Sequence, residues 1–440
     1  MPLETAQEAD GDGLAARQAA FSLLNDIFFR RRSFDEAMAG TRGFGDLPAR
    51  DRAFVRLLVV TVLKRARQMD AMLAHFLHEP FDALKPANLI NVFRLGIAQL
   101  AFLGTPQHAA VNTTVELAAA EGIAHQKALV NAVMRRLARE GLPEMTDRDA
   151  GKFNTPEWLW NEWMKDYGVE TALDIAAANL GDASLDISVK GDPARWAENL
   201  GASVLPTGTL RKPVGGFIPD MPGYKDGAWW IQNAAAALPA KLLGDIKGKT
   251  VVDLCSAPGG KTAQLACAGA KVAAVDRSAQ RMVRLKENMQ RLHCEDVETV
   301  IADGATWKPS ASVDAVLLDA PCTATGTIRH QPDILHLKEP KDQEKLVALQ
   351  RRLLLNAVGM LKSGGTLIYC TCSLQKAEGE NQAEWALSQG LSLQRAPVTH
   401  NEIPELAEMM TEHGEIRCLP SHWKDFNGID GFFVARFVRV

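Results

Sequence analysis

The second half of the chain contains short apolar segments that alternate with segments of helical periodicity. Five apolar segments come in order, namely TVVDL (250–254), KVAAVD (271–276), VETVIA (297–302), VDAVLLD (313–319) and TLIYCT (366–371). Strands that are apolar on both faces are typical of parallel sheets with helices on either side. The alternation therefore predicts a doubly wound, mostly parallel sheet that binds its ligands at the carboxyl ends of its strands. The C-terminal GFFVARFVRV (431–440) predicts one more strand.

The first third of the chain has apolar residues spaced by three and four. This spacing predicts amphipathic helices over 50–73, 88–103, 108–120 and 128–137. We expect these helices to form a bundle of six or seven.

The same part of the chain is basic. Residues 14–139 hold 17 Lys and Arg against 10 Asp and Glu, a difference of +7, although the whole chain carries a net charge of −4. Clusters such as RRR (30–32) and KRAR (64–67) are expected to meet nucleic-acid phosphates together, while any one cluster is also compatible with an ordinary solvated surface.

Between these two parts the periodicity weakens. FNTPEWLWNEWMKDYG (153–168) predicts a helix with Pro156 in its first turn and its tryptophans in the core. Residues 184–220 combine short strand-like runs with one helix and many Gly and Pro. We therefore expect a disordered tail (1–13), a helical domain (14–145), a small α+β module (146–227) and an α/β domain (228–440).

Cysteine usage and hydropathy limit the class of protein. The odd count of seven cysteines does not suggest a disulfide framework, and the spacing of a zinc site is missing. Cys370 and Cys372 lie two apart on a strand, about 7 Å from each other, so they do not bond together. With no apolar run of about 18 residues, we expect a cytoplasmic monomer with no metal and no membrane partner.

The first strand of the α/β domain leads into a glycine loop, CSAPGGKT (255–262), and then a helix. Gly259 and Gly260 let the backbone approach a ligand, and the amides at the helix start point toward it. GGKT resembles the end of a P-loop, and VLLDAP (316–321) resembles its magnesium strand, but Cys255 replaces the first glycine of that motif. A second candidate ligand is S-adenosylmethionine.

Aspartates end the next three strands. Asp276 ends the second strand, where an acid can accept hydrogen bonds from ribose hydroxyls. Asp303 follows the third strand, on the adenine side, and Asp319 ends the fourth. One such aspartate is commonly a cap or loop former. Three in succession favour a nucleoside site and therefore S-adenosylmethionine as the cofactor.

Four motifs make the chain similar to the Sun family of RNA cytosine-5 methyltransferases. They are DLCSAPGGKT (253–262), VDRS (275–278), DAPCTATGTIRHQPDI (319–334) and TCS (371–373). The helical part, with FRLGIAQLAFLGTPQHAAVNTTVELA (93–118), resembles the NusB fold. The resemblance implies a Rossmann-like methyltransferase domain preceded by a NusB-like RNA-binding bundle, with small-subunit 16S ribosomal RNA as the partner. We expect the cofactor to contact Cys255, Ser256, Ala257, Pro258, Gly259, Gly260, Lys261, Asp276, Arg281, Asp303 and Asp319.

The chemistry of this family explains the two cysteine motifs. Carbon 5 of cytosine is a weak nucleophile until a thiolate adds to carbon 6. Cys372 follows the fifth strand and fits that nucleophile, a role that the resemblance also assigns to it. The resemblance implies that Cys322 assists release of the methylated product. Asp319 would hydrogen-bond the ring, and Cys370 is expected to be a buried structural thiol.

The target base must leave its stack to reach the thiol, so we expect single-stranded or looped RNA. Basic residues of the helical domain and the RHQPD loop (329–333) would hold the flanking backbone. The polar KAEGEN (376–381) is expected to begin the next helix, with Glu380 and Asn381 near the mouth of the site.

Three other functions remain open on sequence alone. A P-loop NTPase would bind ATP with magnesium. A DNA cytosine-5 methyltransferase would use Cys322 as the nucleophile. A non-catalytic RNA-binding protein would use the helical domain alone. Lys261 is equally compatible with a substrate-facing cation, a cofactor-loop residue or an ordinary surface lysine.

Overall fold

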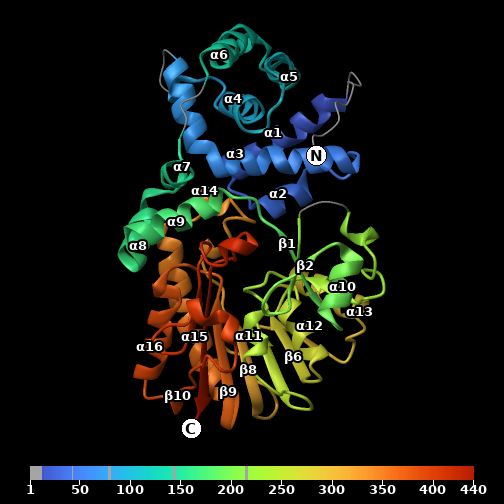
Figure 1. The fold of residues 1–440 in the computed structure, drawn as a ribbon, viewed down its shortest axis with the longest axis vertical. Coiled ribbons are helices and arrows are strands. Elements are labelled where there is room, and N and C mark those ends of the chain that lie inside the picture. The colour runs from blue at the N-terminus through green and yellow to red at the C-terminus, as the bar shows by residue number, and fades with distance from the viewer. Residues whose placement is uncertain (1–11, 42, 78–80, 142–144, 214–216) are drawn as a thin grey trace. The chain divides into compact units, whose positions relative to one another are not determined.

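The computed structural model describes residues 12–41, 43–77, 81–141, 145–213 and 217–440. These residues form two compact units (Figure 1). The first unit consists of the described residues up to Trp160 together with Gln331–Leu337, and the second of Asn161–His330 and Lys338–Val440. Most of the predicted tail lies outside the described residues, and its last two residues, Asp12 and Gly13, already belong to the first helix.

The first unit is helical, as the apolar spacing predicted. Its helices are α1 (Asp12–Arg30), α2 (Phe34–Gly40), α3 (Ala49–Phe76), α4 (Leu89–Ile97), α5 (Gln107–Ala120), α6 (Lys127–Glu140), α7 (Asp147–Asn154) and α14 (Ile334–Leu337), with 3-10 turns at Phe81–Ala83 and Ala124–Gln126. A π-helix (Ala98–Phe102) continues α4, so the helix predicted over 88–103 is not a uniform α-helix. Buried aliphatic and aromatic side chains of α1 to α6 share one core.

Gly96 allows α4 to approach its neighbours closely. A Cβ at this position would lie 2.7 Å from Thr114 Oγ1 of α5 and 2.8 Å from Met134 Cε of α6. Any larger residue would therefore separate the helices or displace these side chains.

The second unit begins at Asn161, within α8 (Glu157–Tyr167), and continues with α9 (Val169–Leu180) and a small sheet. α8 starts one residue after Pro156, which therefore precedes the helix instead of lying in its first turn. Trp160 and Trp163 are buried, as predicted. Four strands, β1 (Leu185–Val189), β2 (Ser203–Val204), β3 (Leu210–Lys212) and β4 (Trp229–Ile231), form an antiparallel sheet in the order β2-β3-β1-β4, and α10 (Pro193–Leu200) joins β1 to β2.

The main sheet has eight strands. They are β5 (Thr250–Leu254), β6 (Lys271–Asp276), β7 (Glu298–Ile301), β8 (Val313–Asp319), β9 (Leu361–Thr371), β10 (Leu393–Arg395), β11 (Ile416–Cys418) and β12 (Phe432–Arg439). The order is β10-β12-β9-β8-β5-β6-β7, and β11 pairs with β12. β5 to β9 pair in parallel. β12 pairs antiparallel with β9, and β10 and β11 each pair antiparallel with β12. The predicted doubly wound, mostly parallel sheet is confirmed.

Alternate residues of the central strands pack into two hydrophobic layers, one on each face of the sheet. Val251 and Leu317 contribute to the layer that includes α11 (Leu238–Lys241) and Leu265 of α12 (Gly260–Cys267). Val252 and Leu318 contribute to the opposite layer, with α15 (Pro340–Met360) and α16 (Glu380–Ser388). Each such buried side chain contributes about 1.5–3 kcal/mol to folding.

The strand order reverses between β5 and β8. In open α/β sheets, ligands bind in the crevice outside the carboxyl ends of the strands at such a reversal. The glycine loop after β5 and the Asp-Ala-Pro-Cys motif after β8 both leave the sheet there. No helix of the described residues has the length and hydropathy needed to cross a bilayer.

Candidate active site

The loop between β5 and α12 is held in a conformation that its glycines permit. Gly259, directly before α12, has a φ of 104°. This value suits glycine, and a Cβ there would also lie 3.0 Å from Leu285 Cγ of α13 (Ala279–Arg291). The first amides of α12 have no partner within the helix, so the loop and helix start together offer donors to an anionic group.

Two predicted cofactor residues converge on Ala257 of this loop. Asp276, at the end of β6, accepts hydrogen bonds from the amide of Ala257 at 3.2 Å and from that of Ser278 at 2.8 Å. Arg281 donates to the carbonyl of Ala257, and its Nη1 lies 3.5 Å from the Asp276 carboxylate. Asp303 lies beyond β7 and accepts a hydrogen bond from the amide of Ala305, so it caps its own turn.

Asp253 belongs to this region and was not among the predicted site residues. It lies in β5 and is fully buried. One carboxylate oxygen accepts a hydrogen bond from Thr262 Oγ1 at 2.6 Å, and the other has no hydrogen-bond partner among the described residues. Burial raises the pKa of Asp253 to about 7. An aspartate in an otherwise apolar strand was the available sequence signal.

We expect Asp253 to make the stability of the protein depend on pH. Its folded-state pKa of about 7 lies above the ordinary value of 3.8, so the folded state holds this proton more tightly. The resulting stabilisation, at most about 4 kcal/mol, is complete below pH 4 and is lost as the pH rises through 7. Asp253→Asn should therefore raise the melting temperature relative to wild type more at pH 8 than at pH 5.

Thermal unfolding of both proteins at the two pH values measures this effect. Asp303→Asn is the matched control, since it removes an exposed carboxylate at the same edge of the sheet. If the difference in melting temperature between Asp253→Asn and wild type is the same at pH 5 and at pH 8, the raised pKa of Asp253 is contradicted.

Lys261 is a buried residue and not a surface lysine. Its Nζ lies 2.7 Å from Asp319 Oδ2 at the end of β8 and 5.2 Å from the centre of the Phe432 ring. In a P-loop the lysine would bind phosphates and the aspartate would serve magnesium. Here the two residues pair with each other, which disfavours the NTPase alternative. The described residues contain no cluster of three or more His, Cys, Asp or Glu placed to hold a metal ion.

The ends of β8 and β9 bring two cysteines together. The Sγ atoms of Cys322 and Cys372 lie 3.5 Å apart, although the residues are 50 positions apart in the chain. Cys370 is fully buried, as predicted, and its Sγ lies 3.6 Å from Asp319 Oδ1. The sequence pair Cys370 and Cys372 is therefore divided in space between the core and the candidate site.

The surroundings of Cys322 favour the protonated form of its thiol. The hydrogen bond with Cys372, followed by burial, raises the pKa of the Cys322 thiol well above its usual value. The Glu378 carboxylate acts in the same direction. Cys322 is consequently a protonated thiol at neutral pH, and it can donate a hydrogen bond to the neighbouring sulfur.

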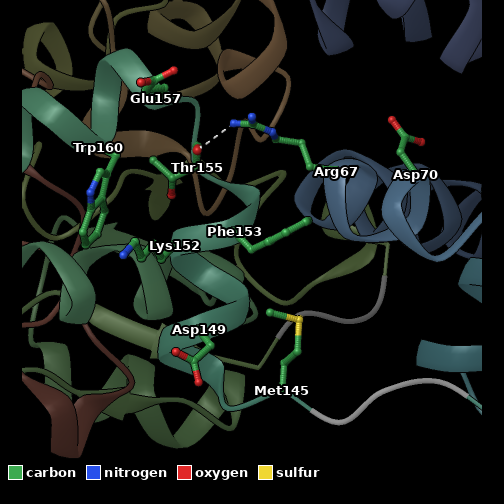
Figure 2. Close-up of a pocket in the computed structure, with 9 residues that line it drawn as sticks. All are labelled: Arg67, Asp70, Met145, Asp149, Lys152, Phe153, Thr155, Glu157 and Trp160. Carbon is green, nitrogen blue, oxygen red and sulfur yellow. Dashed lines mark hydrogen bonds between the residues drawn. The ribbon is translucent and has the colours of Figure 1, made fainter. Parts of the chain in front are cut away.

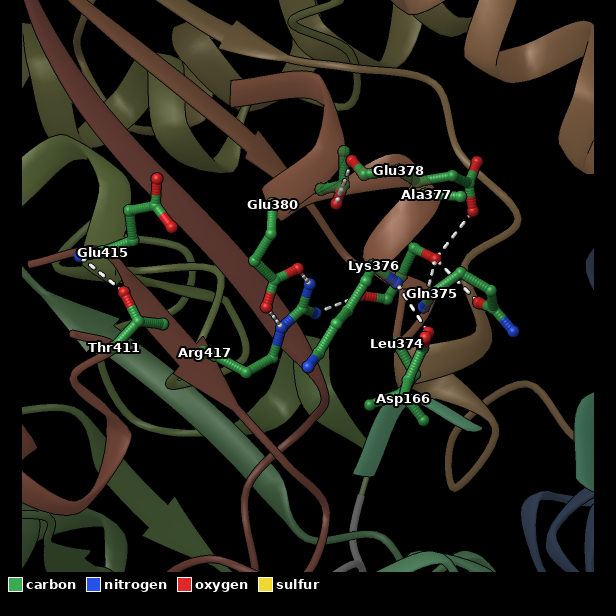
Figure 3. Close-up of polar contacts among 12 residues, drawn as sticks. Asp166, Leu374, Gln375, Lys376, Ala377, Glu378, Glu380, Thr411, Glu415 and Arg417 are labelled. Carbon is green, nitrogen blue, oxygen red and sulfur yellow. Dashed lines mark hydrogen bonds and ion pairs between the residues drawn. The ribbon is translucent and has the colours of Figure 1, made fainter. Parts of the chain in front are cut away.

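An ion pair between a buried arginine and a half-buried glutamate supports the backbone after Cys372 (Figure 3). Arg417 of β11 donates from Nε and Nη2 to the two carboxylate oxygens of Glu380, at 3.0 and 2.5 Å. Its Nη1 donates to the carbonyl of Ser373 at 2.6 Å. The sequence contained no local signal for Arg417, because its partners lie about 40 residues earlier in the chain. Glu380 begins α16, as predicted, but its carboxylate is committed to Arg417.

The RHQPD loop differs from the prediction that its basic residues hold RNA. Arg329 is buried and donates to the carbonyls of Asp182 at 3.0 Å and Asn427 at 2.7 Å. Arg329 therefore stabilises the fold by connecting two backbone segments in the interior. His330 is exposed, with its Nε2 3.3 Å from Asp430 Oδ1, and is the better placed of the two to meet a substrate.

The basic clusters of the helical unit are partly neutralised within the unit. Arg30 and Arg32 both pair with Asp26, at 2.6 and 3.1 Å. Lys64 of the KRAR cluster is buried. Exposed basic side chains remain, but these two clusters present fewer unpaired cations to RNA than their residue types suggested.

A separate cavity of about 640 Å³ lies in the helical unit (Figure 2). Its lining includes Phe153, which is 44% exposed, and Lys152, whose Nζ lies 5.0 Å from the centre of the Trp160 ring. Arg67 lines the cavity too, with Nη1 donating to the carbonyl of Thr155 at 2.9 Å. The acidic lining residues outnumber the basic ones, so this cavity does not have the charge of a phosphate-binding surface. They are Asp70, Asp149 and Glu157.

Comparison with known proteins adds to this description. The model of the NusB family matches residues 14–139, and the model described as 16S rRNA methyltransferase RsmB/F matches residues 240–438. Ribosomal RNA small subunit methyltransferase B of Xanthomonas campestris is 35% identical over 413 residues, which cover 89% of this chain and 92% of that protein.

Two solved structures have a similar fold. The structure of PH0851 has a TM-score of 0.77 at 21% identity and covers 99% of this chain and 100% of its own. NSun6 from Pyrococcus horikoshii, solved with the ligand SFG, has a TM-score of 0.54 at 19% identity and covers 65% of this chain and 98% of its own. At these identities the likeness concerns the fold, and the predicted α-helical and α/β architecture agrees with it.

Proposed function

The chain belongs to the RsmB/F family of 16S rRNA methyltransferases, and on that premise we propose that it methylates carbon 5 of a cytosine in 16S ribosomal RNA. It is an S-adenosylmethionine-dependent methyltransferase, as its family is. One observation supports cytosine as the target base and carbon 5 as the methylated atom. Two cysteines from adjacent strand ends have their sulfur atoms 3.5 Å apart, next to an aspartate that is bonded to the cofactor-loop lysine.

The residues of the β5 loop fit the cofactor. Gly259 gives the loop its turn at a φ of 104°, the start of α12 offers amides to a carboxylate, and Asp276 lies against the loop at the end of β6. When bound there, S-adenosylmethionine supplies an electrophilic methyl group. Among the remaining predicted residues, we propose that Arg281, beside Asp276, and Asp303, at the adenine end, also contact the cofactor. Cys255 is half-buried, and desolvation raises the pKa of its thiol, which makes it a poor nucleophile.

Cys372 is the proposed nucleophile. Its thiolate forms a bond to carbon 6 of cytosine, the electron pair of the 5,6 double bond shifts to form a 4,5 double bond, and the negative charge is taken up at N3, so that the ring becomes an enamine. This makes carbon 5 reactive toward the methyl group. Asp319, whose side chain is 33% exposed, accepts a hydrogen bond from the amino group of the base while Lys261 holds its other oxygen.

Cys322 is the proposed partner for release. After methyl transfer, the proton on carbon 5 is removed by a base and the bond between carbon 6 and sulfur breaks. Cys372 then departs as a thiolate. The protonated Cys322 thiol, 3.5 Å from that sulfur, donates a hydrogen bond to the departing thiolate and so favours the elimination.

We assign RNA holding to the helical domain, residues 14–145, and catalysis to residues 228–440. The α+β module at 146–227 lies between them in sequence. Since Arg329 is buried and the basic clusters are partly paired, the exposed arginines of the helical domain and His330 are the candidates for contact with the RNA backbone.

Identification of the methylated nucleoside tests the proposal. The wild-type protein is incubated with unmodified 16S rRNA and methyl-labelled S-adenosylmethionine, and the RNA is digested to nucleosides. We expect the label in 5-methylcytidine. Label at a nitrogen of the base, transfer to DNA but not to RNA, or ATP hydrolysis without transfer would each contradict the proposal and favour another function.

A further inference from the structure

Glu378 is a fully buried carboxylate that no step of the proposed mechanism uses. It lies at the end of a short 3-10 helix, Lys376–Glu378, between the Cys372 loop and α16 (Figure 3). Its hydrogen-bond donors come from both cysteine loops and from α15. Burying a carboxylate is costly, and the donors that the described residues give to this carboxylate are all neutral, so its position requires an explanation.

The first set of bonds fixes the residues on both sides of Cys322. The amide of Thr323 donates to Glu378, 3.0 Å from Oε1 and 3.2 Å from Oε2. Gln350 of α15 donates from the same Nε2 to Glu378 Oε1 at 3.0 Å and to the carbonyl of Pro321 at 2.9 Å. The backbone before and after Cys322 is therefore tied to this carboxylate, directly or through one side chain.

The second set of bonds fixes the residues on both sides of Cys372. Ser373 donates from Oγ to Glu378 Oε2 at 2.6 Å. Thr371 donates from Oγ1 to the Glu378 carbonyl at 3.3 Å, and Tyr369 donates to the same carbonyl at 2.7 Å. One residue thus connects the neighbours of both sulfur atoms, which come from different strands.

The donors to the carboxylate are an amide, two hydroxyls and a side-chain amide, all of them neutral. Burial raises the pKa of Glu378, and the Glu378 carboxylate in turn helps to raise the pKa of the Cys322 thiol. A glutamine of the same shape would keep one acceptor but would place a donor group against the amide or hydroxyls of the other loop.

We propose that Glu378 is a positioning residue that clamps the Cys322 and Cys372 loops together, so that the two sulfur atoms can act in succession on the same base. The inference rests on the proposed function, since it gives both cysteines a step in one reaction. It assigns Glu378 no contact with the substrate.

Glu378→Gln tests the clamp. With 16S rRNA and labelled S-adenosylmethionine, we expect the turnover number to fall about 10- to 100-fold, because a displacement of about 1 Å at reacting groups has effects of this size. The KM for RNA and the dissociation constant for S-adenosylmethionine should stay within about threefold of wild type, since neither binding surface contains Glu378. The fraction of enzyme trapped as a covalent RNA adduct on denaturing gels should rise, because release requires the Cys322 thiol to stay close to the sulfur of Cys372.

Glu415→Gln is the matched control. Glu415 is also buried and its pKa is also raised by burial, but its carboxylate pairs with Arg395. We expect its turnover and adduct level to match wild type. Thr323→Val is the second variant, for the case that Glu378→Gln does not fold, because it removes one hydroxyl donor to Glu378 with little change in volume. It should shift turnover and adduct in the same direction by a smaller factor.

The outcomes separate the two proposals. If wild type forms no 5-methylcytidine, the proposed function fails regardless of Glu378. If wild type is active and both Glu378→Gln and Thr323→Val match it in turnover and adduct level, the clamp is wrong. A loss of cofactor affinity in step with turnover would assign Glu378 to general maintenance of the fold and would also overturn the proposal.

Discussion

Cys372→Ala is expected to abolish methyl transfer to RNA, by about 10⁴-fold or more, since removal of an essential nucleophile has effects of this size. The reason is chemical, because without a thiolate at carbon 6 the base has no reactive carbon 5. Binding of S-adenosylmethionine should stay within about twofold of wild type, because the proposed cofactor residues follow β5, β6 and β7, whereas Cys372 follows β9. Labelled methyl transfer and a calorimetric titration measure the two quantities.

Cys418→Ala is the control for this substitution. Cys418 is a buried thiol in the same sheet whose Sγ lies 3.4 Å from Met409 Sδ. It should lose about 1 kcal/mol of stability, as is typical of a small core truncation, and keep its activity. Retained turnover in Cys372→Ala would contradict the assignment of the nucleophile and would favour a non-catalytic RNA-binding role or a different nucleophile.

Cys322→Ala is expected to transfer about one methyl group per enzyme molecule and then to stop, with the protein covalently bound to RNA. Cys372 is still present in this variant, so addition and methyl transfer proceed. The departing Cys372 thiolate has lost the thiol that lay 3.5 Å away, so elimination is slow. A band of protein plus RNA on a denaturing gel, carrying label from the cofactor, measures the stalled species.

The double variant Cys322→Ala/Cys372→Ala is the control for the stalled adduct, and it should form none. A DNA-type mechanism predicts the reverse pattern, in which Cys322→Ala forms no adduct and transfers no methyl group. That result would exchange the roles of the two cysteines while leaving the geometry of the pair unchanged.

The parallel strands of the main sheet and its C-terminal strand were predictable from the sequence almost to the residue, whereas the short strands β10 and β11 were not predicted. β5, β6 and β8 have the bounds that the apolar runs predicted, and β9 begins five residues earlier than its apolar run. Buried parallel strands are continuous apolar runs, so local pattern is enough to find them. The glycine loop was found in the same way, because a strand, a glycine turn and a helix start are consecutive in the chain.

Other features had a local signal that was incomplete. The π-helix after α4 follows the same apolar spacing as an α-helix, so periodicity could not separate the two. Arg329 had the residue type of an RNA contact, yet it is buried against two backbone carbonyls. A residue type states what a side chain can bond to, and only its surroundings decide whether those partners are in solvent or inside the protein.

The sequence by itself determined the fold class, the cofactor loop and the motifs that contain Cys322 and Cys372. The tertiary structure alone decided which side chains meet. β8 and β9 are neighbours in the sheet, and this adjacency places the two sulfur atoms 3.5 Å apart and separates Cys370 from Cys372. Lys261 with Asp319, and Arg417 with Glu380, likewise join residues that are 58 and 37 positions apart. Periodicity describes each element separately, whereas these contacts depend on strand order and on packing between elements distant in the chain, which no local pattern contains.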